Sequence, residues 1–278
     1  MKRRNAIKLV AGTIAAGAAG VTILTQAFKP EKGPAISPKK VEANTAETEW
    51  NYTILDPATT AAHAYENFNI GSCMYGVFSS IIAQLGEKIG APYTSFPVHM
   101  MKYGHGGIGG TGTICGSLNG ATAIFGLLID DKKIRDILTS EILCWYEMNP
   151  FPTFKPVEPT FDFTPNTSIS ESVLCHASAA KWVKKTGYRI DSKERVERCR
   201  RLTADVTAHT VEMLNSYFDN TFVTHYQNNE TVNECMACHG GHGKLGNSTG
   251  KMNCTSCHDK TVGHSLFGDV HYQMMDKK

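Results

Sequence analysis

Two copies of the sequence Cys-x-x-Cys-His lie near the C-terminus and carry the clearest chemical signal in the chain. They are Cys235, Cys238 and His239, and Cys254, Cys257 and His258. Two thiols one helical turn apart can add to the two vinyl groups on one edge of a porphyrin, and the next residue places an imidazole under the iron. The spacing therefore predicts two covalently attached haem c groups, with His239 and His258 as proximal iron ligands.

The same four cysteines also have the spacing of a four-thiolate zinc site, which is the alternative. Each pair is followed directly by histidine, which such a zinc site does not need, and further histidines lie nearby. Large aliphatic residues nearly vanish after Asn220, so this segment has no apolar core of its own. A haem would supply one, and these observations favour haem over zinc.

The sixth ligand of each iron would decide what the haems do. A second axial histidine closes the iron to substrates and suits electron transfer, whereas an open position permits catalysis. Four histidines are candidates for the distal positions: His225, His242, His264 and His271. Each of them could instead face solvent or contact a haem propionate. The supply of spare histidines favours two closed haems.

Five further cysteines precede the haem motifs, and all lie on expected helices. They are Cys73, Cys115, Cys144, Cys175 and Cys199. None of them forms a Cys-x-x-Cys pair, so spacing alone favours buried cysteines that act as small hydrophobic residues. Two disulfides are a second interpretation in an oxidising compartment, with one thiol left over.

The elements that must position these residues are expected to be helices. Apolar residues recur at helical spacing, and no clear alternating strand pattern appears. Asp56 and Pro57 are typical of a helix start, and Ser72 is a candidate cap for a second helix. Four more helices are expected over residues 114–129, 130–148, 170–186 and 192–218. Prolines between these helices predict an ordered or extended loop from 150 to 170.

The domain organisation follows from this composition. Residues 51–220 are expected to form an all-α body with long loops, and residues 221–278 an irregular dihaem segment poor in regular structure. Six glycines between residues 104 and 112 allow positive φ angles and a close approach of the backbone. A phosphate-binding loop is disfavoured there, because no strand precedes the run and no Lys-Ser or Lys-Thr follows it. A turn beside a metal cluster, or tight helix contact, fits better.

The N-terminus resembles an export signal. Residues 1–28 begin with the pair Arg3-Arg4 and Lys8 and continue as an uncharged stretch, which is typical of the twin-arginine route. We expect a periplasmic protein whose signal is cleaved, with a retained membrane anchor as the alternative. Residues 29–50, rich in Pro and Lys, form a tether.

Net charge excludes one class of partner. The formal net charge of the whole chain is +2, with 28 Lys and Arg against 26 Asp and Glu. Lys2, Arg3, Arg4 and Lys8 supply four of the positive charges, and residues 1–27 contain no acid. Without that segment, 24 basic residues stand against 26 acidic ones, a net charge of −2. We therefore expect no nucleic-acid partner, because no basic surplus exists to neutralise phosphates.

The body resembles a known family of redox proteins. A Gly-rich run leads into Cys115-Gly116-Ser117, where that family has Cys-Gly-Ala, and Cys175 and Cys199 follow on later helices. Together with the two haem motifs, residues from about 60 to the end resemble the split-Soret cytochromes c. The resemblance implies a periplasmic homodimer with two closely stacked bis-histidine haems per subunit and one axial histidine supplied by the partner subunit.

The resemblance also implies an iron–sulfur centre in the helical body. Its candidate ligands are Cys73, Cys115, Cys175 and Cys199. Cys144 lies outside this pattern and could replace one of the four. Clusters are assembled in the cytoplasm, so a centre of this kind would also account for a signal that exports folded proteins.

Three functions compete on this basis. The favoured one is a carrier that passes single electrons between periplasmic redox proteins serving as donor and acceptor, rather than an enzyme. A multihaem reductase of a small inorganic oxyanion needs an open haem position, and the haem segment lacks the clustered Lys, Arg and Tyr of an anion pocket. A thiol redox sensor, with the body cysteines as disulfide switches, is the third.

Overall fold

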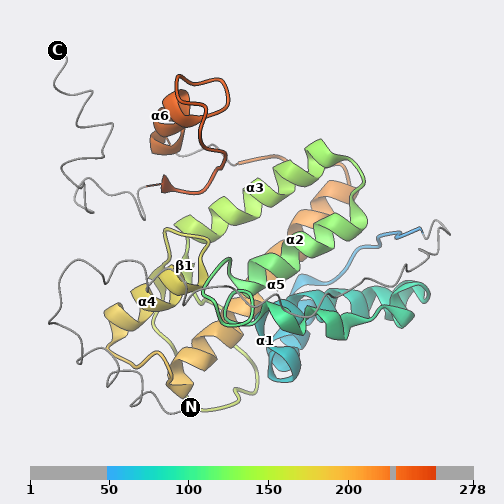
Figure 1. The fold of residues 1–278 in the computed structure, drawn as a ribbon. Helices are drawn as coiled ribbons and strands as arrows, with labels where there is room; N and C mark the ends of the chain where they lie inside the picture. The colour runs from blue at the N-terminus through green and yellow to red at the C-terminus, as the bar shows by residue number, and fades with distance from the viewer. Residues whose placement is uncertain (1–48, 226–229, 255–278) are drawn as a thin grey trace, which may run out of the picture. The chain divides into compact units, whose positions relative to one another are not determined.

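The computed structural model describes residues 49–225 and 230–254. The expected export signal and nearly all of the tether lie outside these residues, as do Cys257, His258, His264 and His271. The helices and strands are α1 (Pro57–Ile89), α2 (Gly116–Leu128), α3 (Lys132–Met148), β1 (Pro150–Phe151), β2 (Ser168–Ile169), α4 (Cys175–Thr186), α5 (Lys193–Phe218) and α6 (Glu230–His239), with two 3-10 helices, η3 (Tyr93–Ser95) and η4 (Val98–Gly104). The chain is mostly helical, which confirms the expected all-α body (Figure 1).

Helix α1 begins as its sequence predicts and is interrupted near its middle. The Asp56 side chain accepts a hydrogen bond from the Thr59 amide at 2.6 Å, and Pro57 occupies the first helical position, where its missing N–H costs nothing. Gly71 and Ser72 then leave helical geometry, and Ser72 has a φ of 65°. The break confirms the expected restart of the helix near Ser72, and it makes Cys73 the first residue of the second half of α1.

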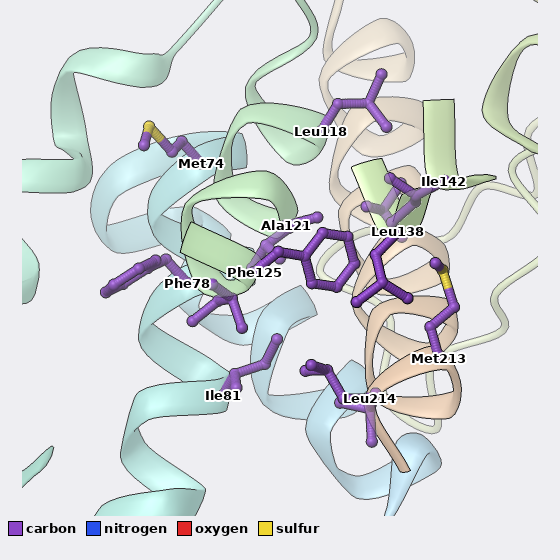
Figure 2. Close-up of a cluster of buried hydrophobic side chains, with 14 of the residues drawn as sticks. Met74, Phe78, Ile81, Leu118, Ala121, Phe125, Leu138, Ile142, Met213 and Leu214 are labelled. Atoms are coloured by element: carbon purple, nitrogen blue, oxygen red, sulfur yellow. The ribbon is translucent and has the colours of Figure 1, made fainter. Parts of the chain in front are cut away.

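The body is built on α1, which packs most extensively on α5 and α2. Figure 2 shows how these helices and α3 contribute to one apolar cluster. Its labelled side chains are Met74, Phe78 and Ile81 from α1, Leu118, Ala121 and Phe125 from α2, Leu138 and Ile142 from α3, and Met213 and Leu214 from α5. Most are inaccessible to solvent, so this cluster holds the four helices together.

The segment before α4 differs from its expected helical structure. Residues 170–174 are not helical: the chain bends at 171–173, where Glu171 has a φ of 49°, and α4 begins only at Cys175. Leu174 forms an antiparallel bridge with Ile114, and the Ser172 amide donates to Ser170 Oγ, so the backbone is satisfied without a helix. The Pro-rich loop also holds a two-stranded ribbon, in which Pro150 pairs with Ile169.

Helix α1 is the one helix among the described residues that is long and apolar enough to cross a membrane. Most of its apolar stretch is buried inside the protein, against α5 and α2, as expected of a core helix.

The C-terminal segment has little apolar packing of its own, as its composition predicts. Of the residues in α6, only Val232 is buried. Beyond α6 the chain folds back, and the amides of Asn247 and Ser248 donate to the carbonyl oxygen of His239 at 3.0 and 2.9 Å. These bonds provide donors for the carbonyl oxygen at the C-terminus of α6 and bring the following residues toward the first haem motif.

Candidate metal centre and haem-attachment segment

Three of the body cysteines lie at the N-termini of helical segments. Cys73 follows the break in α1, Cys115 is the N-cap residue of α2, and Cys175 is the first residue of α4. The unpaired N–H groups and the macrodipole at a helix N-terminus favour negative charge nearby. The same feature lowers the cost of a thiolate. The three segments therefore present thiols where an anionic centre would be stabilised.

A short backbone pairing joins two of these N-termini. Around the bridge between Ile114 and Leu174, the Cys115 amide donates to the Val173 carbonyl at 2.8 Å, and the Cys175 amide donates to the Thr113 carbonyl at 2.7 Å. The non-helical residues before α4, which the sequence did not predict, thus hold the starts of α2 and α4 side by side.

Cys199 completes the group from α5. It shares a small buried cluster with Cys73 and Phe68. On the other side of Cys73, the lack of a side chain at Gly116 allows the start of α2 to lie close to Cys73. A Cβ there would overlap the carbonyl oxygen of Gly104 and lie 2.9 Å from the Cys73 Cβ atom. The close approach expected of the glycine run therefore occurs where α2 begins.

Burial and mutual proximity raise the pKa of two of these thiols, Cys73 and Cys175. The pKa of Cys73 is well above its ordinary value, chiefly because the thiol is buried and also because Cys199, Cys115 and Cys175 are near. The pKa of Cys175 rises to about 12 for the same reasons. The four thiols thus influence one another, as ligands of one centre must, and each is a free thiol in the structure.

Cys144 lies elsewhere. Its thiol is 3.8 Å from the Met148 sulfur. Burial, with smaller contributions from Glu147 and Glu141, raises its pKa to about 11, and none of the other cysteines contributes. It lines a cavity of about 430 Å³ between α3 and residues 251–252. Its position therefore gives no support to the idea that it replaces one of the four.

A buried cation adjoins the group of four. Arg198 is 2% exposed, and its Nη1 atom lies 3.9 Å from the Cys199 sulfur. Its Nη2 atom donates to Ser178 Oγ at 2.8 Å, and its Nε atom is buried without a hydrogen-bond partner. The buried Tyr146 hydroxyl donates to the same serine at 2.8 Å, and the nearby Cys115 thiol helps to raise the pKa of Tyr146, which burial raises most. The cation therefore contacts Cys199 directly and shares Ser178 with a tyrosine that lies near Cys115.

The sequence signal for Arg198 was available but was not used. The residue lies four and eight positions before Leu202 and Val206, two fully buried residues on the same helix. An arginine on the buried face of a helix, directly before a cysteine, indicates a charge that needs a partner. Ser178 and Tyr146 have no comparable signal, because only the fold brings them to Arg198.

The described residues show a limit of this site as a metal centre. Within 49–225 and 230–254, no three His, Cys, Asp or Glu side chains converge tightly enough to hold a single metal ion.

The first haem motif lies at the C-terminal end of α6. Cys235 and Cys238 are one turn apart, and His239 ends the helix. The Nδ1 atom of His239 is 2.9 Å from the Asn247 side-chain oxygen. A histidine that binds a metal commonly donates its other ring N–H to such an acceptor, which fixes the ring orientation. This geometry directs Nε2, on the opposite edge of the ring, away from Asn247.

The two haem motifs approach each other at their first cysteines. The Cys254 thiol lies near Cys235, whose pKa is raised mainly by burial and further by Cys254. Both residues are free thiols in the structure. The described end of the chain therefore brings the start of the second motif to the start of the first.

Two of the four distal candidates are within the described residues, and both are exposed. His242 lies in the turn that follows α6. The backbone amide of His225 donates to Glu141 Oε1 at 2.9 Å, and the Thr224 hydroxyl donates to Glu141 Oε2 at 3.0 Å. These contacts do not distinguish the candidates, so the choice of distal ligand stays a prediction.

Comparisons with known proteins agree on one group. Residues 75–213 match the family model described as "Putative redox-active protein (C_GCAxxG_C_C)". The matched range contains Cys115, Cys144, Cys175 and Cys199, and Cys73 lies two residues before it.

A protein named split-Soret cytochrome c, from Desulfovibrio desulfuricans, is 38% identical over 221 residues, which cover 77% of this chain and 78% of that protein. A solved structure described as a novel iron centre in the split-Soret cytochrome c of the same organism aligns with a TM-score of 0.72 at 37% identity. The alignment covers 77% of this chain and 91% of the solved one.

Proposed function

This chain belongs to the split-Soret cytochrome c family, and from that premise we propose that it is a periplasmic dihaem carrier of single electrons with an iron–sulfur centre in its helical body. Membership itself supports a haem protein with a redox, electron-transfer role. The number of haems, the type of centre, the compartment and the assembly are the parts that we add. The observation that carries the proposal is the gathering of four thiols beside a buried arginine.

The residues fit an iron–sulfur centre. Cys73, Cys115, Cys175 and Cys199 would hold it, since sulfur ligands of this kind bind iron–sulfur clusters. When bound, such a centre supplies iron that accepts and releases one electron at a time. The helix N-termini and Arg198 favour negative charge at the site, and the buried, orphaned Nε of Arg198 indicates a missing anionic neighbour. The related solved structure is described by its iron centre, which supports the same assignment.

The C-terminal segment fits two haems. Cys235 and Cys238 would bind the first covalently, and Cys254 and Cys257 the second, with His239 and His258 as proximal ligands. The contact between His239 and Asn247 supports this role for His239, because it holds the imidazole in one orientation. For the distal positions we propose two of His225, His242, His264 and His271, so that neither iron is open to substrate.

Location and partners follow from the export signal and the family. We propose transport through the twin-arginine route, cleavage of residues 1–28, and a homodimer in the periplasm. Small redox proteins of that compartment would donate and accept the electrons. The near-neutral charge of residues 28–278 is compatible with such exchange and gives no support to a nucleic-acid partner.

Electron paramagnetic resonance of the purified, haem-loaded protein tests the proposal, together with haem and total iron content per chain. We expect two haems per chain, iron in excess of haem, low-spin ferric signals when the protein is oxidised, and an additional cluster signal on reduction. The variant Cys199→Ser should lose the cluster signal and keep both haems, whereas Cys144→Ser should keep all signals.

Two results would count against the proposal. A substantial high-spin ferric signal would mean an open haem and would favour the oxyanion reductase. Iron equal to haem, with no further signal in either state, would remove the iron–sulfur centre and leave the four thiols to a redox sensor.

A further inference from the structure

Arg198 is a buried cation that forms no ion pair in the part of the chain that the structure describes. Its neighbours on α5 differ in this respect. Arg201 contacts Glu197 at 2.8 Å and Arg200 contacts the same carboxylate, so each of these two arginines has an ionic partner, which they share. Arg198 instead contacts Ser178, which is neutral, and the sulfur of Cys199.

The charge of Arg198 cannot be removed by losing a proton, because a guanidinium stays protonated in proteins. Burial without a counter-charge is strongly unfavourable, so a nearby anion must offset it. Asp205 is the carboxylate whose charge Arg198 influences, but its two oxygens accept hydrogen bonds from the Thr153 amide and hydroxyl. The other groups near Arg198 that could carry a negative charge are the thiols of Cys199 and Cys115 and the Tyr146 hydroxyl.

Two contacts extend from Arg198 to the cysteines. Its Nη1 atom faces Cys199 at 3.9 Å. Its Nη2 atom shares Ser178 Oγ with the Tyr146 hydroxyl, and the Cys115 thiol is near enough to act electrostatically on both Tyr146 and Arg198. Cys115 and Cys199 come from different helices, so one guanidinium is linked to two sides of the group.

We propose that Arg198 is the charge-compensating residue of the iron–sulfur centre and that its positive charge sets the reduction potential of that centre. This inference rests on the proposed function, since it needs iron bound by Cys115 and Cys199. Reduction adds one negative charge to a buried site, and a fixed positive charge stabilises the reduced form more than the oxidised form. Removal of that charge therefore lowers the reduction potential.

A redox titration of the holoprotein with dithionite, followed by the cluster signal in electron paramagnetic resonance, tests this. Arg198→Gln removes the charge, and Arg198→Lys keeps it. Arg189→Gln is the control, because Arg189 is an exposed arginine paired with Asp191. We expect Arg198→Gln to shift the redox equilibrium at least tenfold toward the oxidised form, which is about 59 mV for one electron. Arg198→Lys should stay close to wild type, and Arg189→Gln should not shift.

The other possible results distinguish failure of the proposed role of Arg198 from failure of the proposed iron–sulfur centre. An unchanged potential in Arg198→Gln, or equal shifts in Arg198→Gln and Arg198→Lys, would overturn the role of charge while the centre itself stands. If Arg198→Gln loses its non-haem iron, the Arg198→Lys variant tests the inference instead. Non-haem iron that is retained in Arg198→Lys, with a reduction potential close to wild type, would support the role of charge. Loss of this iron from both variants would show that Arg198 is needed only for the structure of the site. A wild-type protein without non-haem iron would overturn the centre, and this inference with it.

Discussion

Burial determines the protonation of the cysteines when no iron is bound. The pKa of Cys175 lies at about 12 and that of Cys73 well above its ordinary value, so both are neutral thiols at pH 7. Thiolates, rather than thiols, bind iron, and iron binding must therefore release protons. The helix N-termini and Arg198 lower the cost of that step. Cys73 and Cys175 are thus uncharged until iron binds.

The stability of the iron-free protein should therefore fall at alkaline pH. An ordinary thiol titrates near pH 9 in the unfolded chain, whereas Cys175 in the folded protein titrates near 12. Its contribution to the free energy of unfolding is thus fully present below pH 9 and is lost as the pH rises toward 12. Thermal melts of chelator-treated protein between pH 7.5 and 11 measure this. Cys175→Ser should show a shallower decline, and parallel curves would contradict the assignment.

Asn247 is expected to hold the proximal imidazole of the first haem. Loss of a partner of this kind typically costs 10–100-fold in metal affinity. In Asn247→Ala, haem should still attach through Cys235 and Cys238, but carbon monoxide should displace an axial ligand of the ferrous haem roughly 10–100-fold more readily. Ser248→Ala is the control, since Ser248 bonds to His239 through its backbone amide. Equal carbon monoxide binding in both variants would remove this role.

Sequence reasoning at this scale is most direct where spacing is local. The Cys-x-x-Cys-His motifs need only one helical turn, so they can be read without a fold, and their haems stay a prediction. The grouping of Cys73, Cys115, Cys175 and Cys199 came from family resemblance, because no local spacing links residues on separate helices. Arg198, Ser178 and Tyr146 were missed, since their relation depends on how α3, α4 and α5 pack.

At the scale of elements, the start of α2 is the most constrained point. It contacts the loop at Gly104 and the second half of α1 at Cys73, and no side chain fits at position 116. The loop before it contains five glycines with positive φ, which most other residues would adopt only with strain: Gly106, Gly107, Gly109, Gly110 and Gly112. These glycines therefore allow the chain to turn between Gly104 and the start of α2, where the close contact at Gly116 occurs.

Two substitutions on α2 should have opposite effects. Gly116→Ala would overpack the contact with Gly104 and Cys73 and should cost about 1–3 kcal/mol of unfolding free energy. Gly126→Ala meets no atom within 4 Å on the same helix, and should stabilise by about 0.4–1 kcal/mol through reduced entropy of the unfolded chain. Denaturant unfolding measures both. A neutral Gly116→Ala with unchanged iron content would contradict the close approach.

The elements themselves were largely predictable. Asp56 and Pro57 mark the start of α1, and the break at Ser72 was expected from its capping residue. The error at residues 170–174 has a physical cause. Their pairing partner is Ile114, sixty residues earlier, and a bridge to a distant segment overrides a local preference for helix.

At the scale of the whole molecule, side-chain contacts tie the C-terminal segment to α3. Lys251 Nζ donates to Ser140 Oγ at 2.9 Å, and Glu141 accepts from Thr224 and from the His225 amide. The haem-attachment segment buries little apolar surface itself, so these polar contacts carry much of its attachment to the body. The composition predicted a segment without a core, but only the structure identifies α3 as the helix that it contacts.

Glu141 is the residue whose removal should loosen this attachment. Hydrogen bonds to a charged acceptor contribute about 1.5–3 kcal/mol, and a change of 1.4 kcal/mol is about a tenfold change in an opening equilibrium. Hydrogen exchange at the His225 amide should therefore accelerate about tenfold or more in Glu141→Ala. Glu212→Ala, which removes an exposed acid that contacts His209 on α5, should leave that amide unchanged. If His225 is also a distal ligand, Glu141→Ala should raise the high-spin ferric fraction of the loaded protein. Faster exchange with an unchanged haem spectrum would show that Glu141 anchors the segment and would assign the distal position to another histidine.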